Sequence, residues 1–373
     1  METAQLKAFA DAEEMEISFG PQHPSTHGVL RLMVKVDGER ILDVKPIIGY
    51  LHRGTEKLFE RESYNGCIPH TDRMDYTAAV TNNQGLVGTV EKLMGVTIPP
   101  RAAYLRMILA ELQRLASHLV WLATHALDIG AQTPYFYCFE ERDKILDLFE
   151  EYCGARLTTN CMRVGGMPFD LTEGWTDRCR AFVEQFPAKV EDWERILTKN
   201  RIWRERTVGV GVISAAAAVE WGLTGPPLRG SGVRWDIRKV FPYDRYDEVE
   251  FDVPIGTNGD TYDRYLVRME EMRQSVRIIR QCLDRLPDGP VMAKVPKVIK
   301  PPKGEVYFSV EAPKGELGYY LVSEGRDTPY RLHVRPPCFI NLQALPEMVR
   351  GQLVADLVAV IGTLDIVLGE IDR

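Results

Sequence analysis

The strongest constraint on the fold is a change in the spacing of hydrophobic residues at about Arg73. Before it, Val29–Val36 and Glu39–Val44 alternate apolar and polar residues on either side of Asp37–Gly38, which predicts a β-hairpin with a tight turn. After it, apolar residues recur at intervals of three and four, the spacing of amphipathic helices. A small β region followed by a helical core is therefore expected.

The same period predicts long helices at Thr77–Met94, Arg101–Ile129, Lys144–Tyr152, Thr176–Lys199 and Thr261–Arg285. Strand-like alternation with glycine and proline turns returns in the C-terminal third, and an apolar helix closes the chain. We predict an α+β fold that is mainly α, with one domain over 1–373. Its parts are a β-hairpin region (14–48), a helical core (73–286), a second β-region (305–334) and a C-terminal helix (346–364).

The composition is that of a globular protein that does not enter the bilayer. Of 373 residues, 45% are hydrophobic and 27% are charged, and the net charge is -7 without a lysine or arginine block, so nucleic acid is not an expected partner. No apolar run approaches the roughly 18 residues that span a bilayer. The acidic start lacks the order of a secretory signal, so we expect a cytosolic chain that reaches a membrane only through partner subunits.

The seven cysteines are scattered, and no two are three residues apart. In a cytosolic chain this pattern predicts reduced core thiols and no metal site. The chain also lacks a Gly-rich phosphate loop, since the nearest approach, Gly209–Ser214, has no third glycine. If the activity involves NADH, the nucleotide must bind another chain.

Several polar clusters remain as candidate sites. His23 and His27 lie in a loop stiffened by prolines, Gly20–Gly28, where they could satisfy backbone groups or present an imidazole to a ligand. A second cluster, Pro69–Tyr76, precedes the first long helix, and its Asp72 could cap that helix. A third, His52–Lys57, is charged and is compatible with a solvated loop.

The second long helix carries three further polar residues. His118 and His125 are seven apart, and His125 and Asp128 form an i, i+3 pair on one helix face. Two histidines do not suffice for a metal centre, which needs three or four ligands. Asp128 stands at an apolar helix end, where a buried carboxylate needs a partner, and a histidine is the natural one.

These clusters, in this order, resemble the 49-kilodalton-type subunit family of respiratory complex I, the NADH:quinone oxidoreductase. The resemblance rests on four motifs, G-P-Q-H-P-S-T-H-G, H-R-G-T-E-K, H-T-D-R-M-D-Y and the C-terminal D-I-V-L-G-E-I-D-R, and on intermediate stretches such as Arg229–Lys239, Gly259–Tyr265 and Glu311–Glu316. It spans nearly the whole chain. The family is similar to the large subunit of nickel–iron hydrogenases, which implies a hydrogenase-large-subunit-like fold. The paired C-x-x-C ligands of that enzyme are missing, which argues against a nickel centre.

The resemblance implies a site for the quinone headgroup, with ubiquinone or menaquinone as substrate. His27 and Tyr76 match the family's quinone-binding pair, and Asp128 matches the carboxylate that orients the histidine. Arg53 and Arg73 match arginines near an iron–sulfur cluster that a partner subunit ligates. His23, Asp365 and Val367 match further positions around the cavity. No metal is expected on this chain itself.

The resemblance further implies work within an assembly. Expected partners are the other complex I subunits, including the cluster-bearing subunit and the membrane-arm subunits, with a peripheral location on the cytoplasmic face of the bacterial inner membrane. Two alternatives are the equivalent subunit of a complex fed by ferredoxin or another carrier, and a scaffold without catalytic residues. Thr158 stands where many relatives carry a histidine, so we expect a cluster potential that depends less on pH.

Overall fold

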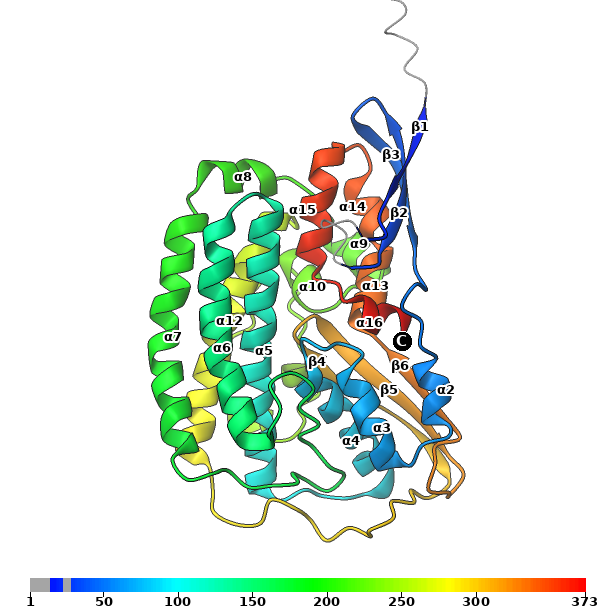
Figure 1. Ribbon diagram of the computed structural model, residues 1–373, viewed down its shortest axis with the longest axis vertical. Helices are drawn as coiled ribbons and strands as arrows, with labels where there is room; N and C mark the ends of the chain where they lie inside the picture. Colours follow the sequence, from blue (N-terminus) through cyan, green and yellow to red (C-terminus); the bar gives the residue numbers. More distant parts are fainter. Residues whose placement is uncertain (1–13, 23–27) are drawn as a thin grey trace, which may run out of the picture.

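The computed structural model describes residues 14–22 and 28–373. Its strands are β1 Met15–Phe19, β2 Arg31–Asp37, β3 Arg40–Ile47, β4 Gly304–Ala312, β5 Gly315–Ser323 and β6 Arg331–Arg335. Its helices are α2 Thr55–Phe59, α3 Tyr64–Asp72, α4 Ala79–Met94, α5 Pro100–Asp128, α6 Gln132–Cys153, α7 Trp175–Leu197, α8 Arg201–Thr207, α9 Ala215–Glu220, α10 Pro226–Gly230, α11 Ile237–Val240, η2 Tyr246–Glu248, α12 Thr261–Arg285, α13 Pro337–Gln343, α14 Leu345–Val349, α15 Val354–Leu364 and α16 Leu368–Asp372. Figure 1 shows their arrangement.

The N-terminal sheet has the antiparallel order β1-β2-β3 and extends from the rest of the molecule (Figure 1). Leu32, Val34 and Val36 alternate inward along β2, as the period of two predicts. The hairpin is confirmed, but Asp37 pairs with Arg40, so the turn residues follow Asp37 and lie one position later than predicted.

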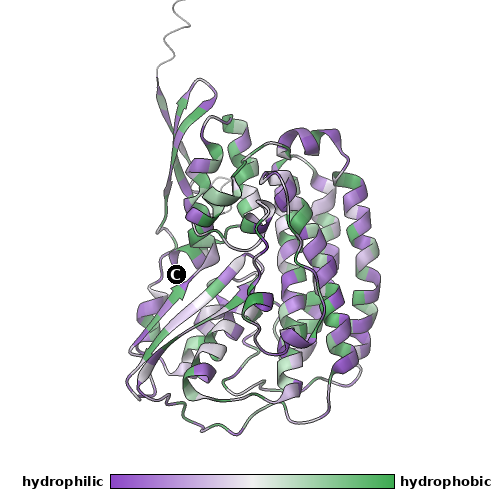
Figure 2. Ribbon diagram, turned by 180° about the vertical axis from the view of Figure 1, so that it is seen from behind, coloured by the Kyte–Doolittle hydropathy of each residue, from purple (hydrophilic) through white to green (hydrophobic). Residues whose placement is uncertain are grey.

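The helical core is built around α5, α6, α7 and α12, which run side by side (Figure 1). Most of α5 is buried because neighbouring helices cover it on several sides. Hydrophobic and hydrophilic residues alternate along these helices (Figure 2), so each helix presents an apolar stripe to its neighbours.

The second sheet, β4-β5-β6, is antiparallel and packs against α4. Two glycines of α4 allow this close approach. A Cβ at Gly85 would lie 2.7 Å from the ring of Tyr319, and one at Gly88 would lie 2.4 Å from the ring of Phe308. Larger residues at these two positions would push the sheet away from α4.

The mainly α, α+β fold is confirmed, although two local predictions were wrong. Asp72 does not cap α4; it is the last residue of α3 and accepts a hydrogen bond from Asn83 Nδ2 at 2.8 Å. The predicted C-terminal helix is interrupted between α14 and α15, because Gly351 N donates to Ile41 O at 2.8 Å and Val354 N to Glu39 O at 3.0 Å. These backbone groups serve the neighbouring hairpin and leave the helical ladder.

Two further features concern the interior and the surface. All seven cysteines are free thiols, and all but Cys153 are buried, as predicted. Within 14–22 and 28–373, no helix has the length and apolar character required to cross a membrane.

Candidate functional site

Tyr76 lies in the short segment between α3 and α4, held by its two neighbours. The carboxylate of Asp75 accepts hydrogen bonds from Thr77 N at 3.1 Å and Thr77 Oγ1 at 2.7 Å, which closes a tight Asx-type turn. Asp75 and Thr77 are buried, whereas 43% of Tyr76 is exposed. The phenol is therefore fixed at its base and open at its surface.

The ammonium group of Lys314 closes this turn from behind. Its Nζ lies 3.0 Å from Asp75 Oδ2 and donates to Thr77 Oγ1 at 2.7 Å and to Ser117 Oγ of α5 at 3.0 Å. Asp365 Oδ2 is 3.8 Å away. Burial lowers the pKa of Lys314, but the carboxylates of Asp365 and Asp75 outweigh it and raise that pKa above its usual value. A permanently charged cation therefore lies behind Tyr76.

Asp365 and Val367 follow α15 and face the same corner. Asp365 ends the helix with a positive φ of 54°, a conformation that aspartate tolerates better than most residues. The buried thiol of Cys338 joins the two positions, since it receives a hydrogen bond from Val367 N at 3.4 Å and donates to Asp365 O at 3.8 Å. The same thiol also acts electrostatically on Tyr76.

Glu370 adds a buried acid next to this cluster. Cys338 N donates to Glu370 Oε2 at 3.0 Å. Burial, and then the nearby carboxylate of Asp75, raise the pKa of Glu370 to about 7. At neutral pH this carboxyl group can hold or release a proton.

Arg53 and Arg73 lie together on the exposed side of the site. Arg53 Nη2 donates to Arg73 O at 2.5 Å, and Arg73 Nη1 donates to Pro69 O at 2.7 Å. The C-terminal segment packs directly on this pair, because a Cβ at Gly369 would lie 2.6 Å from Met74 O. The C-terminal motif and the Tyr76 motif therefore form one surface.

Asp128 ends α5 near a neighbouring part of the same C-terminal segment. A Cβ at Gly362 would lie 3.1 Å from Asp128 Oδ2 and 2.5 Å from Nδ1 of His125, so both side chains approach α15 at this glycine. His125 is buried and stacks on Trp121, with ring centroids 5.5 Å apart. Gly362 is three residues before Asp365, which links the two corners of the site through α15.

Tyr76, Arg53, Arg73, Asp365 and Val367 are thus gathered by the structure, and Asp128 lies at the next turn of the same helix end. His23 and His27 fall outside the described residues, so their predicted roles stay predictions.

Sequence reasoning did not select Lys314, Cys338 or Glu370. Lys314 is within a stretch that carried the family resemblance, but its position at a hairpin turn suggested an exposed side chain.

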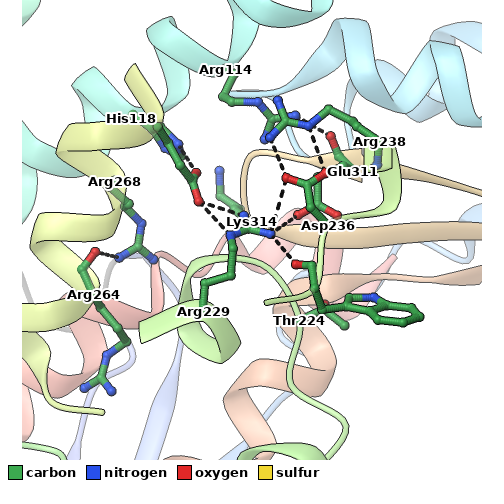
Figure 3. Close-up of polar contacts among 12 residues, drawn as sticks. Arg114, His118, Thr224, Arg229, Asp236, Arg238, Arg264, Arg268, Glu311 and Lys314 are labelled. Carbon is green, nitrogen blue, oxygen red and sulfur yellow. Dashed lines mark hydrogen bonds and ion pairs between the residues drawn. The ribbon is translucent and has the colours of Figure 1, made fainter. Parts of the chain in front are cut away.

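Behind this corner lies a buried network of opposite charges (Figure 3). At its centre, Arg229 lies 2.7 Å from both Glu271 and Glu311. Glu271 also contacts His118 Nε2 at 2.9 Å, and burial lowers the pKa of His118 to about 4 despite that carboxylate. The remaining members of the network are Glu111, Arg114, Asp236 and Arg238.

A polar cavity of about 420 Å³ lies apart from these residues, between α4, the start of α5 and 242–247. Its floor includes Asp244, whose pKa burial raises to about 6. None of the predicted site residues lines it.

Comparison with known proteins assigns the chain to a family. The model of the family described as "Respiratory-chain NADH dehydrogenase, 49 Kd subunit" matches residues 128–302 and 295–373. A protein of Solibacter usitatus, named as an NADH-quinone oxidoreductase subunit, is 59% identical over 98% of this chain and 99% of its own length. Proteins with the same enzyme and subunit name from Geotalea uraniireducens and Clostridium beijerinckii are 56% and 51% identical, with coverage of 98% and 97% of this chain and 100% and 98% of their own.

The chain is therefore a subunit of an oxidoreductase complex. It belongs to the family of the 49-kilodalton subunit of respiratory-chain NADH dehydrogenase.

Proposed function

We propose that this chain forms the quinone-reduction site of a proton-translocating NADH:quinone oxidoreductase and is active only within that complex. The observation that carries the proposal is the geometry of Tyr76, an exposed phenol whose base is held by the buried Asp75–Lys314 pair. The relatives named for NADH–quinone oxidoreductase supply the substrate class.

Reduction of a quinone places negative charge on its two carbonyl oxygens and consumes two protons. The hydroxyl of Tyr76 and the imidazole of His27 would donate hydrogen bonds to these oxygens and supply protons, which stabilises the charge as it develops. Asp128 would orient the ring of His27 and stabilise its protonated form. Asp365, Val367 and His23 would line the same cavity.

Electrons would reach the quinone from an iron–sulfur cluster held by a partner subunit. Arg53 and Arg73 are exposed beside the site, and their positive charges would favour the reduced, more negative cluster. The other partners would be the membrane-arm subunits that carry ion translocation, on the cytoplasmic face of the bacterial inner membrane. No observation favours the ferredoxin-fed alternative.

The experiment is Tyr76→Phe in the assembled complex, with two electron acceptors compared in isolated membranes. Loss of one positioned donor predicts a fall of roughly 10²-fold in NADH oxidation with a short-chain quinone. Electron delivery to a hydrophilic acceptor that reacts upstream should stay unchanged. Normal quinone reduction in this variant would reject the proposal.

A matched control comes from a tyrosine of similar exposure. Tyr137 in α6 is 47% exposed, against 43% for Tyr76, and it lies on another face of the fold. Tyr137→Phe should leave both activities unchanged.

A further inference from the structure

We propose that Lys314 is a positioning residue for quinone reduction, because it fixes the segment that carries Tyr76. The inference rests on the proposed function and adds to it a residue from a distant part of the chain.

The location of Lys314 is unusual for a lysine. It lies in the two-residue turn between β4 and β5, where Ala312 pairs with Gly315. Hairpin turns are normally exposed, but only 1% of this side chain is accessible. The turn enters the interior because Gly315 packs on Thr224, and a Cβ there would lie 2.5 Å from Thr224 Oγ1. The fold therefore places a cation at its centre on a rigid hairpin.

The contacts of Lys314 flank Tyr76 on both sides. Its three donor positions are used by Asp75, Thr77 and Ser117, at 3.0, 2.7 and 3.0 Å. Two of these partners are the residues directly before and after Tyr76, and Ser117 belongs to the central helix α5. Lys314 thus connects the tyrosine segment to the most buried helix of the fold.

The hairpin itself is held in place by the buried charge network. Glu311, three residues before Lys314, accepts hydrogen bonds from Arg229 at 2.7 Å and Ile237 N at 3.1 Å. Arg114 Nη2 donates to the backbone oxygen of the same residue at 2.5 Å. These contacts give the ammonium group a fixed position, as Figure 3 shows for Arg229 and Glu311.

Two electrostatic effects act on the tyrosine from this cluster. Burial raises the pKa of Tyr76, the carboxylate of Asp75 raises it further, and the ammonium of Lys314 lowers it. The cation therefore eases release of the phenolic proton, in addition to holding the segment in place.

The test is a double-mutant cycle in the assembled complex, with Lys314→Met, Tyr76→Phe and both together. Lys314→Met keeps the side-chain length and removes the charge. We expect roughly a tenfold lower kcat for a short-chain quinone, the size of one lost charge-assisted hydrogen bond, with the upstream acceptor activity unchanged. If Lys314 acts through Tyr76, the double variant should be no slower than Tyr76→Phe alone.

Three results separate the possibilities. Effects that multiply in the double variant, or an unchanged kcat in Lys314→Met, would overturn the positioning role while the proposed function stands. A normal Tyr76→Phe enzyme would reject the proposed function itself. Lys303→Met, at an exposed lysine directly before β4, is the control and should change nothing.

A second background covers failure of Lys314→Met to assemble, since that variant leaves the buried carboxylate of Asp75 without its cation. In Lys314→Met/Asp75→Asn both charges are removed. If this variant assembles and reduces quinone at the normal rate, Lys314 serves only to neutralise Asp75 and the proposal is wrong. A loss of kcat that Tyr76→Phe does not deepen supports it.

Discussion

At the residue scale, buried charges in the site lie next to opposite charges, as their desolvation requires. Lys314 contacts Asp75 at 3.0 Å and faces Asp365 at 3.8 Å. Glu370 differs, because its buried neighbours are the thiol of Cys338 and the carboxylate of Asp75, with Lys314 acting more weakly. These neighbours explain why its carboxyl group favours the protonated form.

Glu370→Gln should change how local stability depends on pH. The pKa of this carboxyl group rises from 4.5 to about 7 in the fold. Between these values the folded state keeps a proton that the unfolded state has released, so stability is lost as pH rises through this window. Above it, the loss is constant and amounts to about 3 kcal/mol at most.

The measurement is hydrogen–deuterium exchange of α16 and α13 peptides in the assembled complex, corrected for the intrinsic rate at each pH. Relative to Glu370→Gln, the natural chain should lose protection as pH rises from about 5 to 7. The groups that face Glu370 from neighbouring elements are Cys338, Asp75, Lys314 and Tyr319. Parallel profiles for the two proteins would show that Glu370 is ionised throughout.

At the element scale, the C-terminal helix α16 is fastened to the loop before α2. Both carboxylate oxygens of Asp372 accept backbone hydrogen bonds, from Gly49 N at 2.8 Å and Leu51 N at 2.7 Å. His52 Nδ1 lies 2.6 Å from Asp372 O. Arg53 follows directly, so this fastening also sets the position of one of the proposed site arginines.

Asp372→Ala should loosen this loop. The substitution removes two charge-assisted hydrogen bonds, a cost of about 3 kcal/mol. Limited proteolysis of the assembled complex should then cleave faster after Arg53, and quinone reduction should fall. Asp327→Ala, at an exposed turn between β5 and β6, is the matched control. Equal cleavage rates in the two variants would show that the loop is held by other contacts.

Elements with a long, regular hydrophobic period were predicted well. The boundaries of α12 agree with the prediction, and those of α5 agree within one residue. The start of α6 was missed, because its first turns carry the exposed aromatic residues Phe136 and Tyr137 and lack a one-sided stripe. The interruption between α14 and α15 depends on backbone pairing with Ile41, about 310 residues earlier, which no local pattern reveals.

At the scale of the whole molecule, the site joins segments from four distant regions. Tyr76 comes from the α3–α4 segment, Lys314 from the β4–β5 turn, Cys338 from α13 and Asp365 from the end of α15. Motif resemblance could name Tyr76 and Asp365, since each stands in a recognisable stretch. It could not show that Lys314 lies between them, because that contact exists only once the second sheet packs against the helical core.

The proposed function requires that quinone binds where these four segments meet. Photolabelling of the assembled complex would test this with a short-chain quinone analogue that carries a photoreactive group, followed by peptide mapping with and without excess unlabelled quinone. We expect labels within 74–78 and 365–369 of this chain that the unlabelled quinone suppresses. Suppressible labels confined to other subunits, with none in these two segments, would show that quinone binds elsewhere.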